Sequence, residues 1–170
     1  MKRIAFIDTE IDPKSGKILD IGSIKDNGAS FHSGSVAAFI EFLQGSEYVC
    51  GHNIIRHDLK YIKNAVEAAG INNSNSIDTL FLSPLLFPKK PYHSLVKDDK
   101  LQTEDINNPL NDSIKARDLF FDEINAFYEL DNELKRIFYT LLRDKGGFSA
   151  FFKYIDATSK SGMENNPVVP

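Results

Sequence analysis

Cysteine is scarce in this sequence of 170 residues, which contains Cys50 alone. A single cysteine cannot form an internal disulfide, and it excludes a cysteine-rich zinc site. Cys50 lies within a short apolar segment that is typical of a buried strand. We therefore interpret it as a small core residue rather than as a nucleophile.

Long apolar runs and a surplus of positive charge are also missing. No apolar run reaches the roughly 18 residues that a helix needs to span a bilayer, and the apolar run near the N-terminus ends early at Asp8, unlike a signal peptide. We therefore expect a cytoplasmic protein without a membrane partner. The formal net charge of −4 argues against tight binding to long duplexes through phosphate contacts alone, although bound cations would offset the charge of an acidic site.

The distribution of apolar residues predicts both strands and helices. Short apolar runs between turn residues predict strands at 3–8, 17–25, 29–32, 48–51 and 76–79. Helical spacing, with Ser35, Asn108 and Asp131 as caps, predicts helices at 36–44, 58–69, 109–127, 132–143 and 148–155. The proline-containing segment 82–92 is expected to be a loop. This order predicts an α/β fold whose sheet carries helices on both faces.

Asp8 and Glu10 lie two residues apart near the end of the first predicted strand. Their side chains therefore project to the same side. Two adjacent carboxylates repel each other, which raises the pKa of one of them unless a cation lies between them. Mg²⁺ or Mn²⁺ would fit, because these ions prefer oxygen ligands. Taken alone, the pair is also explained by a solvated strand edge.

Asp58 and Asp112 each lie at the beginning of a predicted helix. Asp58 follows the polar end of the strand at 48–51, and Asp112 lies just after Asn108 and Pro109. Each carboxylate alone is also explained as a favourable charge on a helix dipole. Together, the strand-end pair and the two helix-start acids can converge on one site.

These segments resemble the motifs of the DEDD superfamily of 3′–5′ exonucleases, which includes the proofreading domains of polymerases. Residues 6–10 are similar to its first motif, 51–58 to its second and 110–120 to its third. Residues 77–80 resemble the segment between the second and third motifs. The resemblance covers about 2–121.

The resemblance implies a ribonuclease H-like fold, with a five-stranded mixed sheet flanked by helices. It places an exonuclease-like domain at 1–129. The helices that follow exceed what this fold needs, so we expect a C-terminal helical extension packed on it at 130–158 and a polar, proline-rich tail or linker at 159–170. These additions indicate a module that is covalently linked to a helicase or polymerase domain.

The resemblance also implies a two-metal phosphodiester hydrolase. Asp8 would bridge two Mg²⁺ or Mn²⁺ ions, and Glu10 and Asp112 would complete the site of the ion that activates water. Asp58 would hold the second ion, which stabilises the leaving 3′ oxygen.

Residues near these acids are expected to contact the substrate. We expect this role for Thr9, Asn53 and His57. The expected substrate is the 3′ end of a single-stranded nucleic acid, DNA in the first instance. The expected product is a nucleoside monophosphate.

The general-base position departs from the family pattern. One branch of the family has His five residues before the third-motif Asp, and the other has Tyr four residues before it. This sequence has Asn107 and Asn108 at these two positions. Asn cannot take up a proton near neutral pH, and general-base help is worth roughly 10²–10⁴-fold in rate. We expect Asn108 to cap the helix and Asn107 to face the metal site. His57 and His93 are candidates to replace the base.

The doubled Asn leaves two alternatives to an active exonuclease. One is a catalytically weak or inactive module that binds or docks nucleic acid on the same fold. The other is an unrelated acidic interaction domain, which would not bind Mn²⁺. An active enzyme is the leading hypothesis, because burying four acids without a metal is costly.

Overall fold

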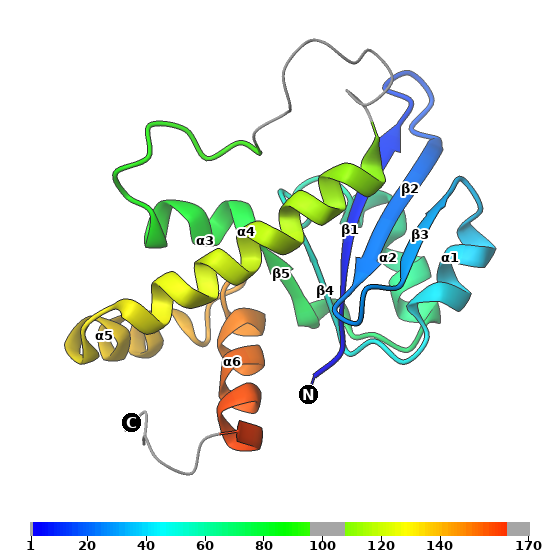
Figure 1. Cartoon of the computed structure of the whole chain (residues 1–170). Helices are drawn as coiled ribbons and strands as arrows, with labels where there is room; N and C mark the ends of the chain where they lie inside the picture. Colours follow the sequence, from blue (N-terminus) through cyan, green and yellow to red (C-terminus); the bar gives the residue numbers. More distant parts are fainter. Residues whose placement is uncertain (1, 96–107, 163–170) are drawn as a thin grey trace.

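The computed structural model describes residues 2–95 and 108–162, with side chains as far as residue 156. It confirms the predicted fold class: helices flank a five-stranded mixed sheet, as in ribonuclease H-like proteins (Figure 1). The strand order is β3-β2-β1-β4-β5. The strands are β1 (Ile4–Ile11), β2 (Ile18–Lys25), β3 (Ser30–Ser33), β4 (Tyr48–Gly51) and β5 (Ser76–Asp78).

Strand β1 is the centre of the sheet and joins two kinds of pairing. β1, β2 and β3 form an antiparallel meander, and β4 and β5 continue the sheet in parallel on the other side of β1. Ile4 and Phe6 belong to one core cluster, whereas Ala5 and Ile7 belong to the other. Because both faces of β1 are covered, its first half is continuously apolar.

The helices are divided between the two faces of the sheet. They are α1 (Val36–Leu43), α2 (Leu59–Ala68), α3 (Thr79–Leu86), α4 (Pro109–Glu129), α5 (Asn132–Leu142) and α6 (Ser149–Gly162), with a short 3₁₀ turn at Asn73–Asn75. α1 and α2 cover the face that carries Ala5 and Ile7. The long helix α4 crosses the opposite face, and α3 and α6 contribute to the same core cluster (Figure 1).

Three predicted helix caps are confirmed. The side chains of Ser35, Asn108 and Asp131 each accept a backbone N–H from the first turns of α1, α4 and α5. Such caps satisfy N–H groups that have no partner within the helix. Local sequence therefore defines these three starts.

The predicted loop at 82–92 is wrong in its first part, because α3 continues to Leu86. Asp78 caps this helix by accepting the N–H of Leu80 at 2.9 Å. Pro84 lies inside the helix on its exposed side. Burial of Leu82 and Leu86 in the core holds the segment helical despite the proline.

The last helix also differs from expectation. α6 continues to Gly162, into the segment expected to be a tail. Phe151 and Phe152 of this helix are almost fully buried in the cluster that contains Phe6 and Phe120. The C-terminal helix therefore shares a core with the sheet.

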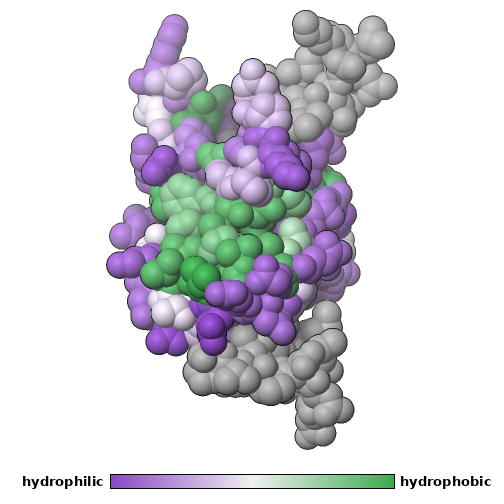
Figure 2. Space-filling model, turned by 90° about the vertical axis from the view of Figure 1, so that its left-hand side faces the viewer, coloured by the Kyte–Doolittle hydropathy of each residue, from purple (hydrophilic) through white to green (hydrophobic). Residues whose placement is uncertain are grey.

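One face of the molecule carries a broad apolar area. Figure 2 shows it on the face at the left of Figure 1, surrounded by polar side chains. On α5, no residue is fully buried, and Ile137 and Leu141 are 41% and 62% exposed. Among the helices that the structure describes, none has the length and apolar character to cross a membrane.

Candidate active site

Asp8 and Glu10 lie near the end of β1 and are half-buried. Asp8 is paired with Gly22 of β2, and Glu10 is paired with Asp20. Phe6, two residues before Asp8, belongs to the cluster beneath α4. By strand alternation, both acids therefore project to the face that α4 covers.

Gly22 allows α4 to begin directly beside Asp8. A Cβ at this glycine would lie 2.0 Å from the backbone nitrogen of Leu110 and 2.1 Å from the carbonyl carbon of Pro109. Only glycine permits so close an approach of two backbones. Asp112 lies in the first turn of α4 and is half-buried. The structure therefore brings Asp112 to the strand end that carries Asp8.

Asp58 is tied to β1 by hydrogen bonds. Its Oδ1 accepts the backbone N–H of Thr9 at 3.0 Å and the Thr9 hydroxyl at 2.5 Å. Burial raises the pKa of Asp58 to about 6, and the Thr9 hydroxyl, the charge of His57 and the Thr9 N–H oppose the rise. Because Thr9 lies between Asp8 and Glu10, its side chain projects to the other side of β1. Asp58 is therefore held at the same strand end, on the opposite side of the strand from the two acids.

The residues expected to contact substrate differ in accessibility. Thr9 is buried, and Asp58 engages both its hydroxyl and its N–H. Asn53 is half-buried in the turn after β4 and has a left-handed φ of 65°. His57 is exposed, and its ring lies edge-on to that of Tyr61 at 5.8 Å between centroids. Of the three, His57 is the most accessible to a substrate.

Asp78 organises the turn that leads to Asp58, a role that the sequence pattern did not reveal. Its carboxylate accepts the N–H groups of Asn53 at 2.8 Å and Ile55 at 3.1 Å, in addition to that of Leu80. Burial raises the pKa of Asp78, and these three hydrogen bonds oppose the rise. One carboxylate thus fixes both the turn after β4 and the start of α3.

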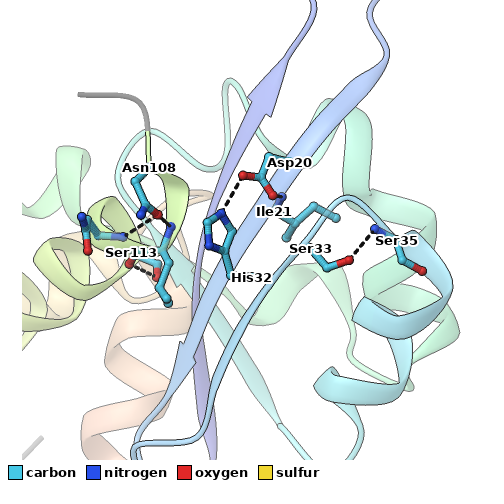
Figure 3. A network of polar contacts seen from close by, with 9 residues as sticks. Asp20, Ile21, His32, Ser33, Ser35, Asn108 and Ser113 are labelled. Atoms are coloured by element: carbon cyan, nitrogen blue, oxygen red, sulfur yellow. Dashed lines mark hydrogen bonds and ion pairs between the residues drawn. The ribbon is translucent and has the colours of Figure 1, made fainter. Parts of the chain in front are cut away.

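A histidine–carboxylate pair lies beside the strand-end acids. His32 of β3 is paired with Gly22, so His32, Gly22 and Asp8 form one row across the sheet. His32 Nε2 lies 2.6 Å from Asp20 Oδ2, and Asp20 is directly opposite Glu10. Figure 3 shows the imidazole turned towards Asp20, with the start of α4 in the same view. This pair depends on the register of three strands, which residue spacing alone does not reveal.

The predicted base positions have different outcomes. Asn108 is engaged as the cap of α4, as predicted: its Oδ1 accepts the N–H of Leu110 at 3.0 Å and that of Asn111 at 3.4 Å. Asn107 lies outside the residues that the structure describes. His93 Nδ1 lies 2.8 Å from the hydroxyl of Ser83 in α3.

No protein-family model matches this chain, and no curated protein is significantly similar to it. The site is therefore judged from its chemistry. Carboxylate oxygens are the donors that Mg²⁺ and Mn²⁺ prefer, so Asp8, Glu10, Asp58 and Asp112 fit such ions by donor type. Within 2–95 and 108–156, no three His, Cys, Asp or Glu side chains are already gathered in an arrangement that could hold a metal ion.

Glu123 is a second buried acid that the sequence pattern did not reveal. It lies on the same stripe of α4 as Phe120 and Phe127 and is fully buried. Neither of its carboxylate oxygens has a hydrogen-bond partner among the described residues. Burial, and then the charge of Asp78, raises the pKa of Glu123 to about 9. This acid is therefore protonated at neutral pH.

Cys50 lies in the same interior and is fully buried, as predicted for a core residue. Burial raises the pKa of its thiol well above the usual value, and the charge of Glu123 adds to the rise. A thiol with a raised pKa is a poor nucleophile. The core interpretation of Cys50 is therefore confirmed.

Proposed function

We propose that this chain is a metal-dependent 3′–5′ exonuclease that hydrolyses phosphodiester bonds at the 3′ ends of single-stranded nucleic acid, DNA in the first instance. The observation that carries the proposal is the contact of Gly22 with Leu110. It brings the first turn of α4, with Asp112, to the end of β1, where Asp8 and Glu10 project to the same face.

The four acids have distinct parts in this proposal. Asp8, Glu10 and Asp112 would bind two Mg²⁺ or Mn²⁺ ions from the α4 face. Asp58 would complete the site, while its bonds to Thr9 fix the position of its carboxylate. When bound, such ions lower the pKa of the attacking water and stabilise the leaving 3′ oxygen.

His32 is the residue that we assign as proton acceptor for the attacking water. Asn108 is occupied as a helix cap and cannot take up a proton. Asp20 Oδ2 lies 2.6 Å from Nε2 of His32. This contact favours the tautomer of His32 that has its proton on Nε2. That tautomer leaves Nδ1 as the acceptor, in the way that a carboxylate orients a catalytic imidazole. His32 lies in the same row of the sheet as Asp8.

A nucleic-acid-binding or docking module with little or no activity is the second candidate. The observation in its favour is that Asn108 has become a structural cap. In either case, we propose that a helicase or polymerase domain linked to this chain delivers the strand.

The test is release of nucleotides from a 3′-labelled single strand in the presence of Mn²⁺. We expect stepwise release of nucleoside monophosphates by the wild-type protein, none in EDTA, and none by Asp8→Asn. Strand binding without hydrolysis at any Mn²⁺ concentration would support the docking module. Absence of both binding and hydrolysis would contradict both candidates.

A further inference from the structure

A cavity of about 550 Å³ opens beside the middle of α4. Its walls are residues 90–95 on one side and α4 on the other, and Ser83 of α3 also lines it. Pockets of 300–1,000 Å³ are typical of small-molecule and cofactor sites. The cavity is therefore large enough for one nucleotide.

The position of the cavity relates it to the proposed active site. Lys115, Leu119 and Asp122 form its α4 wall. With a rise of 1.5 Å per residue, Lys115 lies about 5 Å and Asp122 about 15 Å along α4 from Asp112. The cavity thus begins one helical turn from Asp112 and continues away from the sheet end. If the terminal phosphodiester of a single-stranded nucleic acid lies at Asp112, the nucleotides that precede it would reach the cavity.

The lining offers a stacking surface and hydrogen-bonding groups. Tyr92 is 81% exposed among the described residues, the largest exposed fraction of their large hydrophobic side chains. His93 is fixed by the Ser83 hydroxyl at 2.8 Å. Lys90 lies over the ring of Phe87, 4.4 Å from its centre, which fixes that ammonium group near the cavity wall. An aromatic ring beside ordered cationic groups is the combination that binds single-stranded nucleic acid.

The charges of the lining also limit what it binds. Lys90 and Lys115 are opposed by Asp118 and Asp122. Asp118 is itself paired with Arg117 at 3.0 Å. A nearly balanced lining disfavours a multiply charged ligand such as a nucleoside triphosphate. It suits one base with a single-charged phosphodiester.

We propose that this cavity binds a nucleotide of the single-stranded substrate upstream of the scissile bond, with its base stacked on Tyr92 and its phosphodiester beside Lys90 and Lys115. This inference rests on the proposed exonuclease function. It assigns to the cavity a role in holding the strand and no role in the chemical step.

The experiment compares a short and a long substrate. The p-nitrophenyl ester of thymidine 5′-monophosphate carries one nucleotide and cannot reach the cavity, whereas a single-stranded pentanucleotide can. We expect Tyr92→Ala to raise the KM for the pentanucleotide by about 5- to 150-fold, as for loss of one base–aromatic stack. The same variant should leave kcat and KM for the ester unchanged.

Two control variants separate stacking from general effects. Tyr128→Ala removes an aromatic side chain at the far end of α4 that is 42% exposed, and Lys153→Ala removes an exposed ammonium group of α6. We expect both variants to behave as wild type. The double variant Lys90→Ala, Lys115→Ala should raise the KM for the pentanucleotide and leave that for the ester unchanged. Equal effects of Tyr92→Ala on both substrates, or no effect on either, would overturn the inference.

Failure of the proposed function gives a different result. If the wild type hydrolyses neither substrate, anisotropy of a 5′-fluorescent pentanucleotide in EDTA still tests the cavity. Weaker binding by Tyr92→Ala than by Tyr128→Ala would support a nucleic-acid site without catalysis. Equal affinities of these two variants would overturn it.

Discussion

Asp58 and Glu123 are both buried acids, but their surroundings differ. Asp58 lies at the sheet end and receives two hydrogen bonds from Thr9, whereas Glu123 lies on the buried side of α4 and receives none from the described residues. The pKa is about 6 for Asp58 and about 9 for Glu123. At neutral pH, Asp58 is therefore mostly ionised and Glu123 is neutral. Burial alone does not decide whether an acid is charged at neutral pH, because hydrogen-bond donors can preserve its charge.

The largest effect is expected at the sheet end, where we propose that Asp8 binds the metal ions. Asp8→Ala should reduce nuclease activity about a thousandfold or more, because several kcal/mol of metal-derived transition-state stabilisation is lost. Its melting temperature in EDTA should not fall, since one repelling charge is removed. Release from a 3′-labelled strand and thermal melts measure the two effects. Asp144→Ala, at an exposed position, is the control; a clear loss of stability in Asp8→Ala would assign Asp8 a structural role.

The next effect concerns the proton acceptor. His32→Ala should slow hydrolysis by roughly 10²–10⁴-fold at neutral pH, because the attacking water loses its proton acceptor. Asp20→Asn should give a smaller loss, since it disturbs only the orientation of the ring. The charged group in contact with His32 is Asp20, 2.6 Å from its Nε2, and Asp8 lies in the same row of the sheet two strands away.

Two further variants decide which residue is the base. Asn107→His should restore part of the activity of His32→Ala, because the resemblance to the DEDD exonucleases predicts a histidine general base at this position. His93→Ala is the comparison variant and should retain kcat. A loss of kcat in His93→Ala with none in His32→Ala would reverse the assignment.

A smaller effect is expected in the interior. The pKa of Glu123 is raised from 4.5 to about 9, so the folded state retains a proton that the unfolded state releases between these pH values. Stability should therefore fall as pH rises through this window, by at most about 1.4 kcal/mol per pH unit. Glu123→Gln should remove this decline and unfold at higher urea concentration at pH 8, with unchanged nuclease activity. Glu129→Gln, at an exposed position, should keep the decline; an identical pH dependence in both variants would contradict the pKa assignment.

The smallest effect tests the donors of Asp58. Thr9→Val removes the hydroxyl that bonds to Asp58 and should cost about 1–3 kcal/mol of unfolding free energy, because a buried acceptor loses a partner. The pKa of Asp58, about 6 in the wild type, should rise further, so the loss should grow as pH increases above about 6. Urea unfolding in EDTA measures it, and Thr140→Val on the exposed side of α5 is the control. No difference between these variants would show that the Thr9 N–H alone suffices.

Much of the fold could be predicted because its determinants are local. Ser35, Asn108 and Asp131 cap helices through atoms only a few residues away. The shared side of Asp8 and Glu10 follows from strand alternation alone.

Other features depend on contacts across the fold and were not predictable. The link between Asp20 and His32 requires the register of β2 and β3. Glu123 follows another acid on a helix, so the sequence alone predicts a surface residue. Only the structure shows which side of α4 faces the sheet and that Glu123 lies on it. The helix α3 contains a proline that argues for a loop, and only its burial outweighs that preference.

The absence of a side chain at Gly22 also has a consequence for the order of folding. The backbone of Leu110 can settle on Gly22 only after β1 and β2 have paired. The described part of the chain between the two residues includes β3, β4 and β5 and the helices α1, α2 and α3. Closing so long a loop is slow compared with forming a hairpin or a helix. Asp112 should therefore reach Asp8 late in folding, after β1 and α4 have each formed separately. The proposed nuclease would gain its acidic centre and its final topology in the same step.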